Sequence, residues 1–141
     1  MIRTIGKAAA TLSLVLLASC AAPSKEDEMF ESMLSMQAPR KLNEAQMQEV
    51  LKHPLGTKEN PVRVEGVEGE YRYLARLRCP EGKPPVVDRV GSAADLSPYG
   101  SIMDIYNVVC DAPPNRTVFV DMYHRGHVEL DAVPGFTIVA P

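Results

Sequence analysis

The chain has no tryptophan, few other aromatic residues and no long hydrophobic run. Five tyrosines and three phenylalanines in 141 residues leave little aromatic surface to bury, so we expect a modest core. The apolar run "AAATLSLVLLA" at 8–18 has eleven residues, whereas a helix that spans a bilayer needs about 20. This run is therefore too short to cross a membrane.

Positive charge is also scarce. Fifteen lysines and arginines stand against eighteen aspartates and glutamates, and the formal net charge is −3 at neutral pH. General binding to nucleic acid needs a cationic surface, so we expect no nucleic-acid partner.

The chain carries no specific catalytic motif. It has no G-x-S-x-G nucleophile elbow, and Gly66 and Gly69 lie among acidic residues instead of forming a phosphate-binding loop. The residue types of a Ser/His/Asp hydrolase are present at Ser97, Ser101, Asp104, Asp121 and His124, but almost any chain of this size contains such a set. The sequence favours a non-enzymatic protein without excluding an enzyme.

The first twenty residues are typical of a secretory signal. Arg3 and Lys7 precede the apolar run, which ends in Leu17-Ala18-Ser19-Cys20 and resembles the lipobox of bacterial lipoproteins. In that family a lipid is joined to the cysteine sulfur, the chain is cut before the cysteine, and the new amino group is acylated. The resemblance implies that Cys20 is lipidated and that residues 1–19 are removed. The alternative is a conventional signal cut near Ala21-Ala22, with Cys20 discarded.

The lipobox resemblance also implies a location. A diacylglycerol with an amide-linked chain such as palmitate holds far more firmly than one acyl chain, which binds membranes only marginally. In Gram-negative lipoproteins an aspartate after the cysteine favours the inner membrane, but here Ala21 and Ala22 follow. We expect an anchor in the outer membrane facing the periplasm, where an envelope protein or peptidoglycan would be the partner.

Three cysteines are an odd number for an exported chain. With Cys20 assigned to lipid by the resemblance, Cys79 and Cys110 remain, and an oxidising periplasm would pair them. Such a bond adds on the order of 3–4 kcal/mol in the chain-entropy model. The alternative is a metal site with Cys79 and Cys110 as thiolate ligands. These two residues lack the close paired spacing of zinc ligands, so we prefer the disulfide.

Residues 20–25 form a tether, and the segment 26–53 has helical patterning. A second helix should begin at Asn43, with Gln46 completing a capping box, and end before Pro54. An earlier one should end at Pro39. Its apolar stripe, which either contacts a partner or packs on the domain, comprises Met29, Phe30, Met33, Leu34 and Met36.

Residues 60–141 alternate in the way that strands do. Val62–Val64 predicts a strand, 65–69 a turn and Glu70–Cys79 its antiparallel partner. Further strands are predicted at Val86–Val90, Ile102–Cys110, Thr117–Tyr123 and Phe136–Val139. The fold class is therefore α+β, with one or two N-terminal helices followed by a small antiparallel β-sheet domain with one disulfide.

Two polar groups are candidate binding surfaces. Arg72, Arg76 and Arg78 share one face of the predicted strand, and guanidinium groups suit carboxylates and phosphates. They either bind an anionic partner or pair with neighbouring glutamates across the sheet.

The second group is Asp121, His124 and His127. Imidazole and carboxylate ligands suit a divalent metal such as Zn, Cu or Ni. An H-E-x-x-H helix is absent, and the alternative is an exposed turn without a metal. We expect a non-enzymatic, membrane-anchored binding or structural module that needs no cofactor. The other function considered is a metal-binding, metal-dependent hydrolytic envelope protein that uses His124 and His127.

Overall fold

The computed structural model describes residue 25 and residues 39–141. In this part of the chain the expected α+β class is confirmed: two helices accompany a four-stranded sheet, a two-stranded sheet and a disulfide. The order is α2 (Glu44–Val50), β1 (Val62–Arg63), α3 (Gly66–Arg76), β2 (Leu77–Arg78), β3 (Val86–Ser92), β4 (Asp104–Val109), β5 (Arg116–Asp121) and β6 (Thr137–Ile138).

The main sheet has the strand order β1-β5-β4-β3. Strands β3, β4 and β5 pair antiparallel, with Arg89 opposite Tyr106 and Ile105 opposite Phe119. Contrary to the expectation of a purely antiparallel sheet, β1 runs parallel to β5, with Val62 opposite Val120. A bulge between Arg89 and Gly91 interrupts β3, so the regular register of this strand covers its first four residues.

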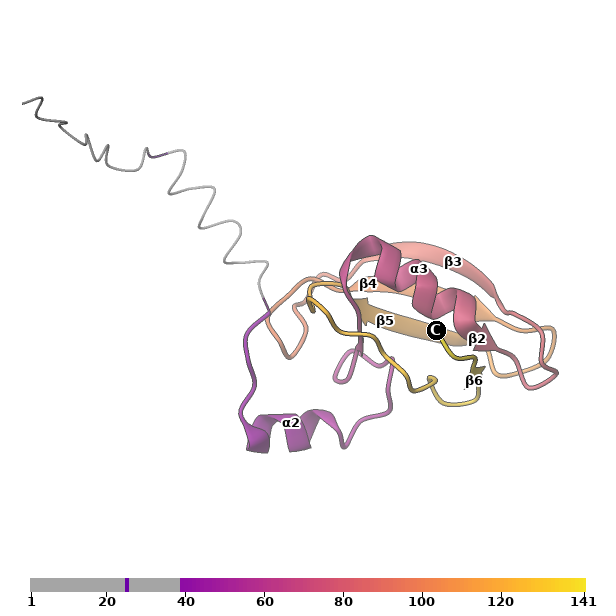
Figure 1. Ribbon diagram of the computed structural model, residues 1–141, viewed down its shortest axis with the longest axis horizontal. Coiled ribbons are helices and arrows are strands. Elements are labelled where there is room, and N and C mark those ends of the chain that lie inside the picture. The colour runs from indigo at the N-terminus through magenta and orange to yellow at the C-terminus, as the bar shows by residue number, and fades with distance from the viewer. Residues whose placement is uncertain (1–24, 26–38) are drawn as a thin grey trace, which may run out of the picture.

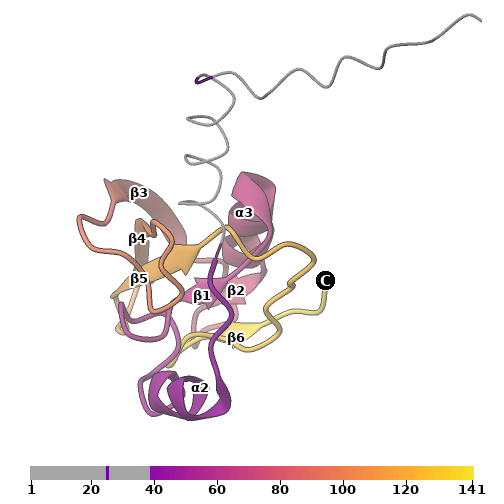
Figure 2. The same cartoon turned by 90° about the vertical axis from the view of Figure 1, so that its left-hand side faces the viewer.

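Helix α3 covers one face of this sheet, and Figure 2 shows helix and sheet as two layers. Tyr73 and Leu74 of the helix pack against buried side chains of β4 and β5, among them Tyr106 and Val118. The core lies between these layers, and its fully buried large residues include Tyr73, Leu77, Tyr106, Val108 and Val120.

The strand predicted at Glu70–Cys79 is wrong, because α3 spans most of that segment. The alternation of Tyr71, Tyr73, Ala75 and Leu77 resembles a strand, but the buried positions follow helical spacing: Glu70, Tyr73, Leu74 and Leu77. A buried glutamate concealed this period, since a charged residue is normally assigned to the surface. The predicted hairpin between Val62–Val64 and Glu70–Cys79 is wrong for the same reason.

Helix α2 begins as predicted. The Asn43 side chain accepts a hydrogen bond from the Gln46 N–H, and the Gln46 side chain accepts one from the Asn43 N–H. Figures 1 and 2 both show α2 lying apart from the main sheet. The preceding chain is fixed to the domain at Arg40, whose N–H donates to Tyr99 O at 2.7 Å and whose Nε donates to Pro98 O.

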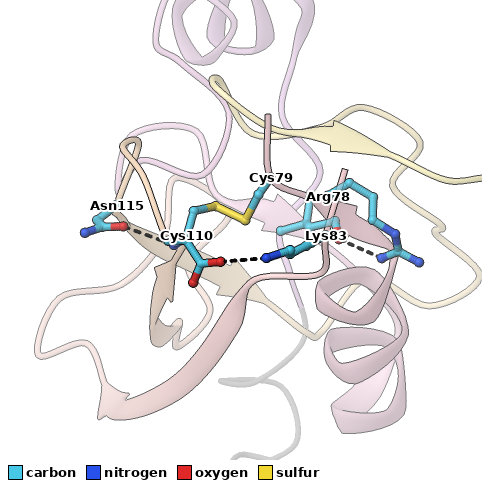
Figure 3. Close-up of a disulfide and its surroundings, with 7 residues drawn as sticks. Arg78, Cys79, Lys83, Cys110 and Asn115 are labelled. Atoms are coloured by element: carbon cyan, nitrogen blue, oxygen red, sulfur yellow. Dashed lines mark hydrogen bonds and ion pairs between the residues drawn. A yellow bond between two sulfur atoms is a disulfide. The ribbon is translucent and has the colours of Figure 1, made fainter. Parts of the chain in front are cut away.

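The disulfide between Cys79 and Cys110 is confirmed, with the Cα atoms 5.8 Å apart. It joins the residue after β2 to the residue after β4, and Figure 3 shows Lys83 and Asn115 beside it. The Asn115 side chain accepts a hydrogen bond from the Cys110 N–H, and Lys83 pairs with Asp111 at 3.0 Å. Strand β2 pairs with β6, which confirms a strand near the C-terminus.

The signal segment, Cys20 and the predicted first helix with its methionine stripe lie outside the described residues. Within the part that is described, no helix has the length and apolar character needed to cross a membrane.

Candidate functional site

Asp121 is the centre of a buried polar cluster. It ends β5 and is 0% exposed. Its Oδ2 accepts hydrogen bonds from Ser97 Oγ, at 2.7 Å, and from Ser101 Oγ. Its Oδ1 accepts one from the Tyr123 N–H at 3.2 Å. A carboxylate without water needs such donors, since an unpaired buried charge is costly.

These bonds control the charge of Asp121 and the shape of the loop 97–101. Burial raises the pKa of Asp121, but the His124 imidazole and the two serine hydroxyls outweigh it, so the pKa lies below its ordinary value. Ser97 Oγ also accepts hydrogen bonds from the N–H groups of Tyr99 and Ser101. The carboxylate therefore holds the same loop to which Arg40 is bonded.

The structure brings together Ser97, Ser101, Asp121 and His124, which include the residue types of a serine hydrolase. Their arrangement in space differs from that of a catalytic nucleophile and its base. In a catalytic triad the imidazole lies between serine and carboxylate, whereas here both serine hydroxyls donate directly to the carboxylate. Ser97 and Ser101 are also buried. This geometry stabilises the loop and leaves neither hydroxyl paired with a base.

His124 and His127 follow β5 in a turn, with the His127 N–H bonded to His124 O. Each imidazole has a carboxylate neighbour: His124 Nε2 lies 3.1 Å from Asp121 Oδ2, and His127 Nε2 lies 3.6 Å from Glu129 Oε2. Neither contact is a hydrogen bond, so both Nε2 atoms are buried without a hydrogen-bond partner among the described residues. Burial, followed by the charge of Arg63, lowers the pKa of His127.

The predicted metal ligands are only partly brought together. Asp121 and His124 are in contact, but the rings of His124 and His127 are 6.4 Å apart between centroids, and His127 faces Glu129. Among the described residues, the ligand atoms that gather within 4.8 Å as a group of three belong to Cys79, Glu81 and Cys110. The disulfide occupies both of those sulfur atoms, so neither group presents a ready set of three metal ligands.

The three arginines do not share a strand face. Arg72 and Arg76 lie in α3, and Arg78 lies in β2. Arg72 is exposed and lies 3.7 Å from Glu68, one helical turn earlier. Arg76 donates to Val139 O and Glu129 O, and Arg78 donates to Ala75 O and Leu77 O. Two of the three guanidinium groups thus help to hold the fold.

A groove lies between the C-terminal half of α3 and the edge strand β3, and we call it the α3–β3 groove. Its volume is about 450 Å³. Its lining is mainly apolar and aromatic: Tyr71, Leu74, Ala75, Pro84, Pro85, Val87, Arg89 and Tyr106. Arg89 is held by a two-pronged ion pair with Asp104, with both N–O distances 2.9 Å.

Glu70 lies between α3 and the sheet, close to this groove. Its Oε2 accepts a hydrogen bond from the Tyr106 hydroxyl at 2.9 Å, and its Oε1 is buried without a partner. Burial raises the pKa of Glu70 to about 7, although the Tyr106 hydrogen bond acts in the opposite direction. Neither Glu70 nor the groove is among the residues predicted from the sequence, because a strand at residues 70–79 places Glu70 outside the core and leaves no helix beside β3.

Family models, curated proteins and solved structures give no match to this chain. Its function must be inferred from its own residues. The sequence signal that would have revealed the groove is the Pro84-Pro85 pair followed by a valine-rich strand, once Glu70–Arg76 is assigned to a helix.

Proposed function

We propose that this chain is a lipoprotein anchored through Cys20 in the outer membrane, and that its folded domain is a non-enzymatic binding or structural module at the cell envelope. The observation that carries the proposal is the Cys79–Cys110 disulfide. It occupies two of the three cysteines and is typical of an oxidising compartment such as the periplasm. Cys20 is then the cysteine available for lipid, at the end of a secretory signal.

The geometry of the polar residues supports a non-enzymatic role. Ser97 and Ser101 donate to Asp121, and Arg89 is paired with Asp104. Side chains that satisfy one another in this way stabilise a fold, whereas a nucleophile must be paired with a base. The α3–β3 groove is an open concave surface of the described residues, and we assign it to binding an envelope protein.

The anchor is tested by Cys20→Ser in cells that receive labelled palmitate. We expect the wild-type protein to carry label and to sediment with outer membranes, and the variant to carry none and to appear in the soluble periplasmic fraction. The double variant Cys79→Ser, Cys110→Ser is the matched control, which should keep the label. Equal labelling of wild type and Cys20→Ser would overturn the anchor.

A metal-binding role at His124 and His127 is a second candidate, favoured by one observation. Both Nε2 atoms are buried without a hydrogen-bond partner among the described residues, and each faces a carboxylate oxygen that could act as a ligand of the same metal ion. The test is metal analysis of the purified chain after incubation with Zn, Cu or Ni. Stoichiometric metal that disappears in His124→Ala and in His127→Ala would support this role, and its absence from the wild type would exclude it.

A further inference from the structure

The disulfide has a carboxylate beside it. In the described residues, the ligand atoms of Cys79, Glu81 and Cys110 all lie within 4.8 Å of one another. Thiolates and carboxylates both bind Zn²⁺ in proteins, and three protein ligands with one water molecule make a four-coordinate site. While the two sulfur atoms are bonded to each other, they are not available to a metal ion. Reduction of the disulfide would free both of them next to Glu81.

A tight turn places Glu81 next to the sulfur atoms. The Gly82 N–H donates to Cys79 O at 2.8 Å, and the Cys79 N–H donates to Lys83 O at 2.8 Å. Pro80 occupies the second position of this turn, where its fixed φ is favoured. Gly82 has a φ of +82°, which other residues rarely adopt. The backbone therefore fixes Glu81 relative to Cys79 without help from the disulfide.

Other contacts keep the two cysteines adjacent. Val86, at the start of β3, lies opposite Val109, the residue before Cys110. Cys79 is 2% exposed within the core, and the Cys110 N–H is bonded to the Asn115 side chain. The Cα atoms are 5.8 Å apart, and two sulfur atoms on one tetrahedral zinc ion lie about 3.8 Å apart with Zn–S bonds of about 2.3 Å. Rotation of the two side chains is sufficient to reach that spacing.

We propose that Cys79, Glu81 and Cys110 form a zinc site that exists only when the disulfide is reduced. The reductant is a dithiol, such as the reduced Cys-x-x-Cys pair of a thiol–disulfide oxidoreductase. One of its thiolates attacks a sulfur of the Cys79–Cys110 bond, and its second thiolate resolves the mixed disulfide. The dithiol thus loses two electrons and becomes a disulfide, and its two protons pass to Cys79 and Cys110.

Zinc then replaces these protons. Zn²⁺ binds the two thiolates, two protons are released to solvent, and the Glu81 carboxylate and a water molecule complete the coordination. Glu81 is exposed, so the ion enters from solvent. Disulfide and zinc are mutually exclusive, and each of them joins the residue after β2 to the residue after β4. The zinc site uses neither the lipid anchor nor the α3–β3 groove, so it goes beyond the proposed function.

The test uses the full chain in detergent micelles, reduced with a phosphine without oxygen and then desalted. Zn²⁺ is titrated in competition with a chromophoric chelator, and Co²⁺ serves as a spectroscopic probe. We expect the reduced chain to bind one more zinc ion than the oxidised chain, and a sulfur-to-cobalt charge-transfer band in the reduced chain alone. A reduced chain that binds no more zinc than the oxidised chain would overturn the proposal.

Glu81→Gln removes the carboxylate ligand and keeps both thiols. Loss of a group that only supports a metal ligand weakens binding about 10–100-fold, so loss of a ligand itself should weaken it at least about tenfold. Glu68→Gln is the matched control, because Glu68 is an exposed carboxylate of α3 outside this group, and its zinc affinity should equal that of the wild type. Equal affinities of Glu81→Gln and the wild type would exclude the site as proposed.

Urea denaturation separates this site from other zinc sites. Zn²⁺ should raise the urea midpoint of the reduced wild type by more than that of Cys79→Ser with Cys110→Ser. An equal rise in both proteins would place the metal elsewhere, for example at His124 and His127, and would contradict the proposal. A reduced chain that is unfolded should regain its native NMR spectrum with zinc, and failure to regain it would also count against the site.

Reoxidation provides a second, independent measurement. Oxidised glutathione, which takes up two electrons, is added to the zinc-loaded chain, and released zinc and remaining thiols are measured together. We expect one zinc ion to be released for each Cys79–Cys110 bond that forms again. Disulfide formation with the zinc retained would show that the ion is held by other residues, and the proposal would then be wrong.

Discussion

Glu70 is a buried carboxyl group whose protonation is linked to folding. Burial raises its pKa from 4.5 to about 7, so the folded protein binds the proton more tightly than the unfolded chain. The stabilisation is complete below about pH 4.5 and is lost as the pH rises through 7. The free energy of unfolding should therefore fall by on the order of 2–3 kcal/mol from this group between pH 5 and 8.

The measurement is urea denaturation of the wild type and of Glu70→Gln at both pH values. The glutamine cannot titrate, so the difference between the two proteins isolates the contribution of this residue. We expect the variant to lose less stability than the wild type over this interval. Parallel pH profiles would show that folding does not change the proton affinity of Glu70.

Ser101 tests how much the hydrogen bonds to Asp121 contribute. Both residues are 0% exposed. Ser101→Ala therefore removes a hydrogen-bond donor to the carboxylate, and water cannot take its place. We expect a decrease of about 1–3 kcal/mol in the free energy of unfolding. Ser92→Ala is the matched control, because Ser92 is an exposed residue whose hydroxyl donates to Asp104, and Asp104 keeps its ion pair with Arg89 in this variant. A control effect as large as that of Ser101→Ala would contradict this explanation.

At the scale of elements, the contact between α3 and the segment after β1 is tight at Gly69. A Cβ at this position would lie 3.0 Å from Cβ of Val64, which is itself buried. Alanine improves helix propensity by up to about 1 kcal/mol over glycine, but overpacking typically costs about 1–3 kcal/mol. We expect Gly69→Ala to lower the free energy of unfolding by about 1 kcal/mol. Val67→Ala, at an exposed position of the same helix, should be nearly neutral. An increase in the stability of Gly69→Ala would show that the Val64 side chain moves to accommodate the added methyl group.

The predictable elements are those with local signals. The Asn43 capping box is complete within four residues and is predicted from the sequence, as are strands β3, β4 and β5, of which β4 alternates between buried and more exposed side chains. Helix α3 was not predicted, because Gly66 and Gly69 are poor helix formers and its buried side includes Glu70. Local propensity was therefore overruled by packing against the sheet.

The Asp121 cluster shows why the site was harder to predict than the fold. Ser97 and Asp121 are 24 positions apart in the chain, and their contact depends on the loop 97–101 folding back toward the end of β5. The sequence supplied the residue types, whereas only the tertiary structure places the hydroxyl groups on the carboxylate. The prediction for Arg72, Arg76 and Arg78 was wrong for a different reason. It depended on a strand at residues 70–79, and without that strand the three side chains do not share a strand face.

For the whole molecule, the disulfide is the principal covalent constraint. It closes a loop across a sequence separation of 31 residues, and the chain-entropy model gives about 3–4 kcal/mol for a loop of this size. We expect Cys79→Ala with Cys110→Ala to lower the free energy of unfolding by this amount in urea denaturation. The wild type with a reductant should show a similar decrease. A double variant as stable as the oxidised wild type would show that the disulfide adds nothing to the stability that the sheet and α3 provide.

In a domain anchored through Cys20, the bonds of Arg40 to the loop 97–101 would determine where mechanical force enters the described part of the chain. That loop precedes β4, and the disulfide follows it, so the two features lie at opposite ends of a strand about 20 Å long. In a domain anchored through Cys20, tension from the membrane is applied at Tyr99 and passes first to the hydrogen bonds around Asp121. The covalent bond lies at the far end of β4, so these hydrogen bonds yield before it bears load. The anchored domain would therefore begin to open at the loop 97–101.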